Sequence, residues 1–276
     1  MRLVAPKMSQ HLGQPVVIEN RPGATGVIAS EQVARAAPDG YTIVMGSIAS
    51  HSSIVPLNKS LPYDAVADFT HIGGATATPA IVVVSNSVPA RDLKEFVAWA
   101  RTQSRGVDYA SGGTGSSAHL AAELVRIRTG TNMVHIPYKE TGRMLADLMA
   151  GTVKFMIYYA SVVPLIHSGQ LKALAVMSQR RLPSLPDVAT TGEQGFENMT
   201  VSAWNALMGP AKLPDGIRDR IYEALYAAVT DPSIQPNLQA QALEAMPMPS
   251  AEFRRFLEAD IAKWTEVVRV AGIKMD

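Results

Sequence analysis

The residues best suited to chemistry form the run YASGGTGSSAHL, from Tyr109 to Leu120. Glycines and hydroxyl side chains there separate an apolar stretch from what reads as the first turn of a helix. The unpaired N–H groups of a first helical turn and the positive end of the helix dipole favour an anion. Glycines let backbone lie against a ligand, and hydroxyls donate further hydrogen bonds or cap the helix. The predicted ligand contacts are Gly113, Thr114, Gly115, Ser116 and Ser117.

Other interpretations of this run compete with an anion site. A capped strand-to-helix turn that binds nothing is equally compatible with it. A P-loop is excluded, because that motif ends in Gly-Lys-Ser/Thr and the run holds no lysine. GTGSSA fits the looser dinucleotide fingerprint G-x-G-x-x-A, with Glu140 as a ribose-binding acid, although its distance from Gly113 exceeds the usual spacing of about 20 residues. The capped turn and the dinucleotide site both stay open.

Two further stretches are thinner candidates. GSIASH, from Gly46 to His51, is a second small, hydroxyl-rich turn after an apolar stretch, where open α/β sheets bind ligands. Tyr158 and Tyr159 end another apolar stretch and could face a cleft, although core packing explains them equally well. His119, on the expected first helical turn, is interpreted as structural.

Catalytic and metal-binding motifs are missing from the sequence. The six histidines form no H-x-x-x-H or H-E-x-x-H pair, and the chain has no cysteine, which excludes thiolate zinc sites, disulfides and a cysteine nucleophile. No G-x-S-x-G motif occurs, and no pair of carboxylates stands out for acid and base roles. The sequence therefore predicts a protein that is not an enzyme, with no cofactor and no bound metal.

Composition sets the class of protein. The chain has 276 residues, 47% hydrophobic and 18% charged, enough for a full core in one large domain or two modest lobes. With 25 Lys plus Arg against 24 Asp plus Glu, no overall field attracts it to nucleic acid or an anionic membrane. The N-terminal residues MRLVAPKMSQHLGQ lack the apolar segment and cleavage site of a secretory signal.

Hydrophobic spacing predicts alternating strands and helices. The chain opens in a helix that Gly13 closes, and a second helix carries Ile28 and Val33. Strands are predicted in PVVIEN, YTIVMG, AIVVVS, VDYA, MVHIPY, KFMIYY, LKALAVM and SAWNALMGPA. Helices are predicted over residues 93–103, 117–128, 141–150, 215–230 and 250–271. This alternation predicts a mostly parallel α/β architecture flanked by helices.

Two extended apolar segments suggest that the chain crosses twice between lobes, near Pro79 and Trp204. Residues 1–79 and 205–276 are then lobe 1, and residues 80–204 are lobe 2.

Several separated motifs together resemble one known family. They are VVIENRPGATG, AAPDGYTIVMG, LPYDAVADF, YASGGTGSSAHL, HIPYKETGRMLADLMAG, LKALAVMSQRRLPSLPDVATTGEQGF and VSAWNALMGPA. In this order they resemble the extracytoplasmic solute-binding proteins of tripartite tricarboxylate transporters, the Bug or TctC family, over essentially the whole chain.

The resemblance implies a two-lobed periplasmic binding protein of the flytrap type (type II) that captures a small carboxylate or related metabolite for membrane permease subunits. It implies a periplasmic location. We expect a monomer, and the balance of charges argues against nucleic-acid partners. The resemblance also assigns backbone and hydroxyl contacts with the ligand to the turn from Gly113 to Ser117, and places a second turn facing the ligand. The contacts that this second turn adds are Ser47, Ala49 and Ser50, and the tyrosine at the strand end, Tyr158, completes the predicted ligand contacts.

The chain departs from the family pattern at three places. It starts in the helix that usually follows a signal peptide, a first strand and a Pro/Gly-rich ligand-binding loop, so we expect an N-terminally truncated member whose sheet lacks a central strand. Glu140 and Thr141 stand where small residues are usual after PYK, and the acid usual after the VDLMF-type strand is replaced in VKFMIYYAS. Ligand identity is therefore not transferable. A dinucleotide-dependent enzyme and a non-functional truncated copy are the alternatives.

Overall fold

The computed structural model describes residues 1–241 and 243–274, which divide into two compact units. Unit 1 comprises Met1–Thr78 and Trp204–Thr265, and unit 2 comprises Pro79–Ala203 with the chain from Glu266 onward. The sequence placed residues 266–276 in lobe 1, whereas the described residues from Glu266 group with unit 2. The pKa of Glu266 is lowered by a hydrogen bond from Arg269 and further by the charge of Arg128 in unit 2.

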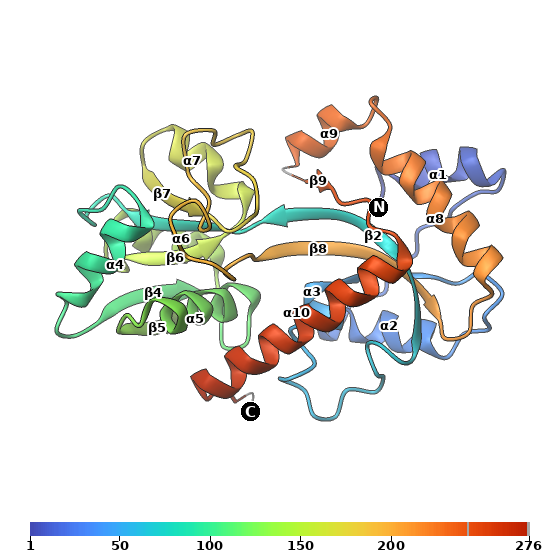
Figure 1. Cartoon of the computed structure of the whole chain (residues 1–276), viewed down its shortest axis with the longest axis horizontal. Coiled ribbons are helices and arrows are strands. Elements are labelled where there is room, and N and C mark those ends of the chain that lie inside the picture. Colours follow the sequence, from blue (N-terminus) through green and yellow to red (C-terminus); the bar gives the residue numbers. More distant parts are fainter. Residues whose placement is uncertain (242, 275–276) are drawn as a thin grey trace. The chain divides into compact units, whose positions relative to one another are not determined.

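Unit 1 is built on a four-stranded sheet of order β1-β8-β2-β9. Strand β1 pairs antiparallel with β8, and β2 pairs antiparallel with β9. A buried core of unit 1 joins side chains of α1, β2, β8 and α8. Figure 1 labels these four elements. The elements that lie wholly or mainly in unit 1 are α1 (Ala5–Leu12), η1 (Ala24–Gly26), α2 (Val27–Ala34), β1 (Val44–Ser47), α3 (Ile48–His51), β2 (Phe69–Pro79), β8 (Ser202–Pro210), α8 (Asp215–Thr230), α9 (Gln235–Ala240), β9 (Glu244–Ala245) and α10 (Ser250–Ala271). Of these, β2, β8 and α10 each extend into unit 2.

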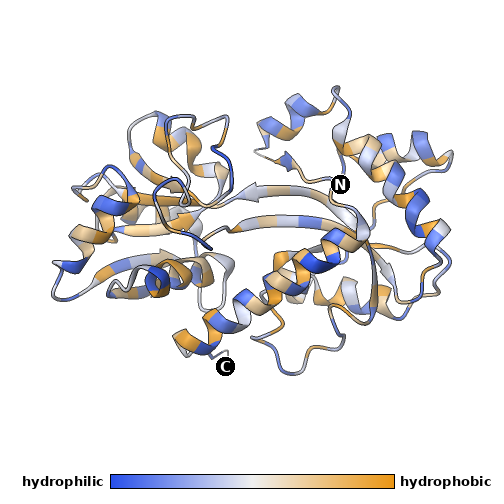
Figure 2. Ribbon diagram, viewed as in Figure 1, coloured by the Kyte–Doolittle hydropathy of each residue, from blue (hydrophilic) through white to orange (hydrophobic). Residues whose placement is uncertain are grey.

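Unit 2 is built on a five-stranded sheet of order β5-β4-β6-β3-β7. Every residue of β3 is buried, and the hydrophobic colours of β3 and β6 in Figure 2 mark the centre of this sheet. Helix α5 packs against β4 and β6 (Figure 1). Its elements are β3 (Ile81–Ser85), α4 (Leu93–Arg101), β4 (Val107–Ser111), α5 (Ser117–Thr129), β5 (Met133–Pro137), α6 (Thr141–Met149), β6 (Phe155–Tyr158), η2 (Ala160–Val162), α7 (Val163–His167) and β7 (Leu171–Val176).

Local signals fix the helix ends that the sequence predicts. Gly13 closes α1 in the left-handed conformation, with φ of 69°. Asp92 caps α4 by accepting the Glu95 N–H at 2.8 Å, and Ser116 caps α5 by accepting the His119 N–H at 3.3 Å. The five helices for which the sequence predicted both limits, over residues 93–103, 117–128, 141–150, 215–230 and 250–271, agree with α4, α5, α6, α8 and α10 to within two residues at each end. The limits of the first two helices were left open.

A buried carboxylate organises the interior of unit 1. Oδ2 of Asp260, which is 5% exposed, accepts from Ser52 Oγ at 2.7 Å, Trp204 Nε1 at 3.0 Å and Trp264 Nε1 at 3.2 Å. Its other oxygen, Oδ1, lies 2.6 Å from Lys263 Nζ. Donors from three separate parts of the chain thus meet on one side chain of α10.

Two expectations about the strands are wrong. The segment PVVIEN, residues 15–20, forms no strand, and Val17 is 84% exposed. No neighbouring strand pairs with it among the described residues, and its Val16 N–H donates instead to Ser9 Oγ at 2.8 Å. The sheets are also mixed rather than mostly parallel: β5, β4 and β6 run parallel, whereas β3 is antiparallel to both β6 and β7.

The α/β architecture with helix-flanked sheets is confirmed. Strand β2 and helix α9 are elements that the hydrophobic pattern did not assign. Within the described residues, no helix is long and apolar enough to cross a membrane.

Candidate functional site

One edge of the sheet in unit 2 collects the candidate residues of that unit. Because β4 is parallel to β5 and β6, and β3 is antiparallel to both β6 and β7, the strands β4, β5, β6 and β7 point the same way. Their carboxyl ends share one edge, which is where open α/β sheets bind ligands. The glycine turn follows β4 at this edge, and Tyr158 ends β6.

The glycine turn, residues 111–117, adopts a backbone that side chains resist. Gly113 has φ of 114° and Gly115 has φ of 77°, both in the region that L-residues rarely enter. A Cβ added at Gly113 would meet nothing within 4 Å, so its backbone faces open space. Glycine is therefore needed at this position for its conformation and not for lack of room.

Hydrogen bonds inside the turn decide which N–H groups are available. The Gly113 N–H donates to Ser111 Oγ at 3.2 Å, and the Gly115 N–H donates to His119 Nδ1 at 3.0 Å. The Ser116 N–H donates to Gly113 O at 3.2 Å. Four other N–H groups have no acceptor among the described residues, those of Gly112, Thr114, Ser117 and Ala118. The turn thus presents unpaired donors beside the N-terminus of the 13-residue helix α5, as an anion requires.

The hydroxyl groups of the turn divide in the same way. Ser116 Oγ is used in capping α5. The side chain of Thr114 is exposed and that of Ser117 is half-buried, and neither hydroxyl has a partner among the described residues. Thr114 and Ser117 are therefore the predicted residues with both a free N–H and a free hydroxyl, whereas Ser116 and Gly115 are occupied by internal bonds.

Two histidines stack behind the turn. The rings of His119 and His135 lie 3.8 Å apart at an interplanar angle of 7°, and Tyr109 stacks on His135 at 5.1 Å. His135 Nε2 lies 2.6 Å from Ser111 Oγ. Burial lowers the pKa of His119 to about 4, with a further contribution from His135, and burial also lowers the pKa of His135. Both rings are uncharged near neutral pH.

Glu123 is the buried carboxylate that contacts Tyr109, the ring stacked on His135. It is 6% exposed, accepts from Tyr109 Oη at 2.6 Å and pairs with Arg126 at 2.7 Å. Burial, followed by the hydrogen bond to Glu123, raises the pKa of Tyr109. The tyrosine therefore stays neutral and acts as the donor.

Tyr158 is half-buried, and its ring packs against the apolar core of unit 2. Its ring lies 6.4 Å from that of Tyr159, and its hydroxyl has no partner among the described residues. Both sequence interpretations, core packing and ligand contact, are compatible with this position.

The second predicted turn, in unit 1, is largely committed to its own structure. Ser47 and Ser50 form a capping box at the start of α3, with the Ser47 N–H donating to Ser50 Oγ at 3.1 Å. Ser50 is 3% exposed, and its Oγ also lies 2.9 Å from Nδ1 of the buried His51. Ser47 and Ala49 are half-buried and more accessible. Ser50 thus supports the turn more than it offers a free hydroxyl.

Burial lowers the pKa of His51 to about 3, with a further contribution from His71. A Cβ added at Gly46 would lie 2.9 Å from His51 Nδ1, so this histidine packs directly on the strand that leads into the turn.

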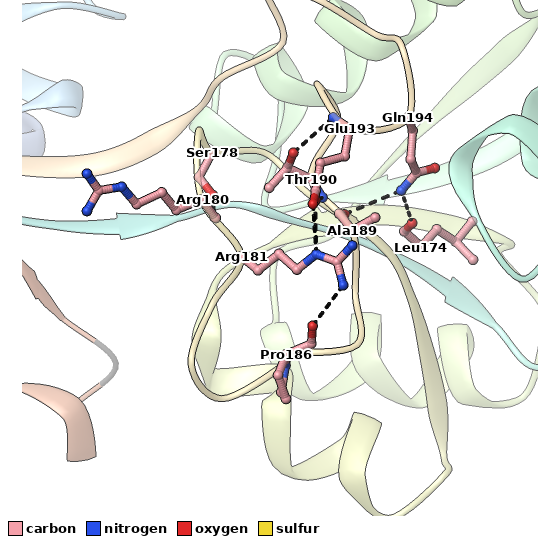
Figure 3. Close-up of polar contacts among 9 residues, drawn as sticks. All are labelled: Leu174, Ser178, Arg180, Arg181, Pro186, Ala189, Thr190, Glu193 and Gln194. Carbon is pink, nitrogen blue, oxygen red and sulfur yellow. Dashed lines mark hydrogen bonds and ion pairs between the residues drawn. The ribbon is translucent and has the colours of Figure 1, made fainter.

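A cation that the sequence analysis missed lies after β7. In the segment from Ser178 to Gln194, Arg181 pairs with Glu193 at 3.0 Å, and the Glu193 carboxylate also accepts the Thr190 N–H at 2.7 Å. Figure 3 shows the Arg180 side chain extending away from this cluster. Its guanidinium is exposed and has no partner among the described residues. The doublet Arg180-Arg181 belongs to one of the motifs that resemble the family, but sequence alone does not say which arginine is paired.

No group of three His, Asp or Glu side chains within residues 1–241 and 243–274 could hold a metal ion.

Comparisons with known proteins give the family context. The family model for the tripartite tricarboxylate transporter family receptor, TctC, matches residues 1–273. Protein BugT of Bordetella pertussis is 31% identical over 276 residues, covering 99% of this chain and 85% of the relative.

Two solved structures with bound molecules are also similar. Rpa4515 of R. palustris with adipate has 31% identity and a TM-score of 0.79, covering 99% of this chain and 92% of that chain. MatC of Rhodopseudomonas palustris with bound malate has 29% identity and a TM-score of 0.73, covering 97% of this chain and 92% of that chain.

Proposed function

Because this chain belongs to the tripartite tricarboxylate transporter receptor family, we propose that it binds a small dicarboxylate through the glycine turn of unit 2 and delivers it to membrane subunits of such a transporter. The family consists of periplasmic solute-binding receptors and not of enzymes. The alternative of a dinucleotide-dependent enzyme is therefore wrong. The predictions of the family, of the receptor role and of a two-lobed periplasmic binding protein fold are confirmed.

The observation that carries the proposal is the set of unpaired N–H groups on the glycine turn. Thr114, Ser117 and Ala118 offer N–H donors without acceptors, beside the positive end of α5. A carboxylate accepts such donors through two oxygens and several lone pairs. Gly113 contributes through its left-handed backbone conformation. Gly115 and Ser116 contribute through hydrogen bonds with His119 that fix the turn.

The remaining contacts of the proposed site follow from accessibility. Malate and adipate, held by two similar proteins, each carry two carboxylates. The unpaired guanidinium of Arg180, after a strand whose carboxyl end lies at the same sheet edge, is a donor of the right charge for a second carboxylate. Tyr158, which ends β6 in the same unit, contributes its hydroxyl. Within unit 1 taken by itself, Ser47 and Ala49 are more accessible than Ser50 and remain the proposed ligand contacts of that unit.

The wider setting of the protein is proposed on the same basis. Family members act in the periplasm, and we place this chain there as a monomer. A formal net charge of +1 gives no support to a nucleic-acid partner.

A thermal-shift screen of the purified protein tests the proposal. Malate, adipate and other C4–C6 dicarboxylates are compared with the dimethyl ester of adipate and with NAD, each at pH 7.5. A free dicarboxylate at 100 times its Kd stabilises the protein by about 2.7 kcal/mol, whereas the ester and NAD should leave the melting temperature unchanged. Stabilisation by the ester equal to that by adipate contradicts carboxylate recognition. A cooperatively folded protein that responds to no dicarboxylate supports the non-functional copy instead.

A further inference from the structure

His119 and His135 hold the glycine turn from two sides. His119 Nδ1 accepts the Gly115 N–H at 3.0 Å, which places the proton of the neutral ring on Nε2. His135 Nε2 bonds Ser111 Oγ at 2.6 Å, and that oxygen contacts both Gly113 N at 3.2 Å and Gly113 O at 3.1 Å. Both glycines with positive φ are thereby tied to one stacked pair of rings.

The contact of His119 with the turn exists only while His119 is neutral. An imidazolium carries N–H donors on both nitrogens, so a protonated His119 would point a donor at the donor of Gly115. The ring of His135, stacked 3.8 Å away, would also face a positive charge at close range.

The surroundings of the two histidines favour their neutral forms. Within the described part of the chain, they offer no free carboxylate to pair with a protonated ring. On β4, Tyr109 is a neutral donor, and on α5 the carboxylate of Glu123 is already engaged by Tyr109 and Arg126. Glu123 raises the pKa of both histidines, but for each the lowering by burial is the larger effect. No second carboxylate contacts the two rings among the described residues.

We propose that His119, braced by its stack on His135, is the positioning residue of the glycine turn, and that protonation of this pair releases the Gly115 N–H and weakens carboxylate binding in acid. The second half of this inference rests on the proposed function, whereas the first half concerns the turn alone. The predicted weakening comes from the loss of the contact that fixes the Gly115 backbone, which lies between the donors of Thr114 and Ser117 in the turn. The positive charge gained by His119 acts in the opposite direction, and the second experiment measures which effect is larger.

The first experiment needs no ligand. Amide and imidazole NMR spectra are recorded from pH 7.5 to 3.5 for the wild type, His119→Asn and His119→Ala. In asparagine, Oδ1 stands as many bonds from Cα as Nδ1 does in histidine, so His119→Asn keeps an acceptor that does not titrate. In the wild type the Gly115 amide should titrate together with the His119 ring, with a midpoint well below 6.5. It should not titrate in His119→Asn, and it should lose its protection from hydrogen exchange in His119→Ala.

Titration of His119 without a change at Gly115 overturns the positioning role. So does a Gly115 amide that is equally protected in His119→Ala and in the wild type. These results do not depend on any carboxylate. They therefore test the positioning role of His119 even if the proposed function is refuted.

The second experiment measures the affinity for malate and adipate by calorimetry at pH 7.5 and pH 4.0. The ligand's own protonation affects the wild type and His119→Asn alike, so their affinity ratio isolates His119. His119→Ala should bind about fivefold more weakly than the wild type at pH 7.5, the loss expected for about one hydrogen bond. At pH 4.0 the affinity of the wild type should be about twofold lower relative to that of His119→Asn than it is at pH 7.5. An unchanged ratio, or tighter wild-type binding in acid, overturns the switch. No binding by any variant at pH 7.5 refutes the proposed function and with it the second half of the inference.

Discussion

The glycine turn should tolerate a methyl group at one glycine and not at its neighbour. Gly113 has φ of 114°, whereas Gly112 is not among the residues with positive φ. A Cβ added at either position would meet nothing within 4 Å. Gly112→Ala and Gly113→Ala therefore form a matched pair that differs in backbone strain and not in steric clash.

The cost of Gly113→Ala follows from that backbone. Holding a non-glycine residue in a sparsely populated region costs of order 1–3 kcal/mol. If the turn keeps its conformation, the melting temperature should fall by about 2–12 °C, at about 2–4 °C per kcal/mol for a chain of this size. If the turn relaxes instead, stability is retained, and the same free energy appears as a carboxylate affinity reduced about 5- to 150-fold.

Both quantities are measured on both variants, by calorimetric melting without ligand and by titration with the dicarboxylate that binds the wild type. Gly112→Ala should match the wild type in both. Equal melting temperatures and equal affinities for the two variants would refute the role assigned to the Gly113 backbone.

Three further changes have predicted outcomes. Asp260→Ala removes the acceptor of three buried donors and should lower the free energy of unfolding by about 3–5 kcal/mol in denaturant titrations. A loss below about 1 kcal/mol contradicts its organising role. Arg180→Gln should weaken dicarboxylate binding about tenfold, as for a charged hydrogen bond, without changing the melting temperature, whereas unchanged affinity removes Arg180 from the site. His51 has a pKa of about 3 in the folded protein and about 6.5 in the unfolded chain. Its contribution to the free energy of unfolding is therefore full above pH 6.5 and falls between pH 6.5 and pH 3, by up to about 1.4 kcal/mol per pH unit. His51→Gln should flatten this acid limb in unfolding measured against pH, and an identical slope contradicts the assignment.

Helix ends were predictable because their signals are local. Gly13, Asp92 and Ser116 each act within four residues of the helix end that they define, so neighbouring sequence carries the information. The glycine turn was predictable for the same reason, since a strand, glycines and a helix N-terminus follow one another directly.

Strand pairing was not predictable in this way. PVVIEN has the composition of a strand, but a strand exists only where a partner supplies the ladder, and that information lies elsewhere in the chain. The antiparallel orientation of β3 within its sheet is likewise a property of three strands that are distant in sequence.

The hydrogen bonds and the ring stack within the site were also not predictable from the sequence. His119 was interpreted as structural, which is compatible with its burial but does not reveal that it accepts the Gly115 N–H. Its partner His135 is on a different strand, and nothing in the spacing of the two histidines predicts a stack. Only the structure separates the free donors of Thr114 and Ser117 from the occupied donor of Gly115.

The most direct test of the central claim is an amide NMR titration of the wild-type protein with malate and with adipate at pH 7.5. Binding at the glycine turn predicts saturable shifts that are largest for the N–H groups of Thr114, Ser117 and Ala118, with a smaller shift for Gly115, whose N–H is already bonded to His119. Saturable binding that leaves these four amides unmoved, or the absence of saturable binding to either dicarboxylate, would contradict the account.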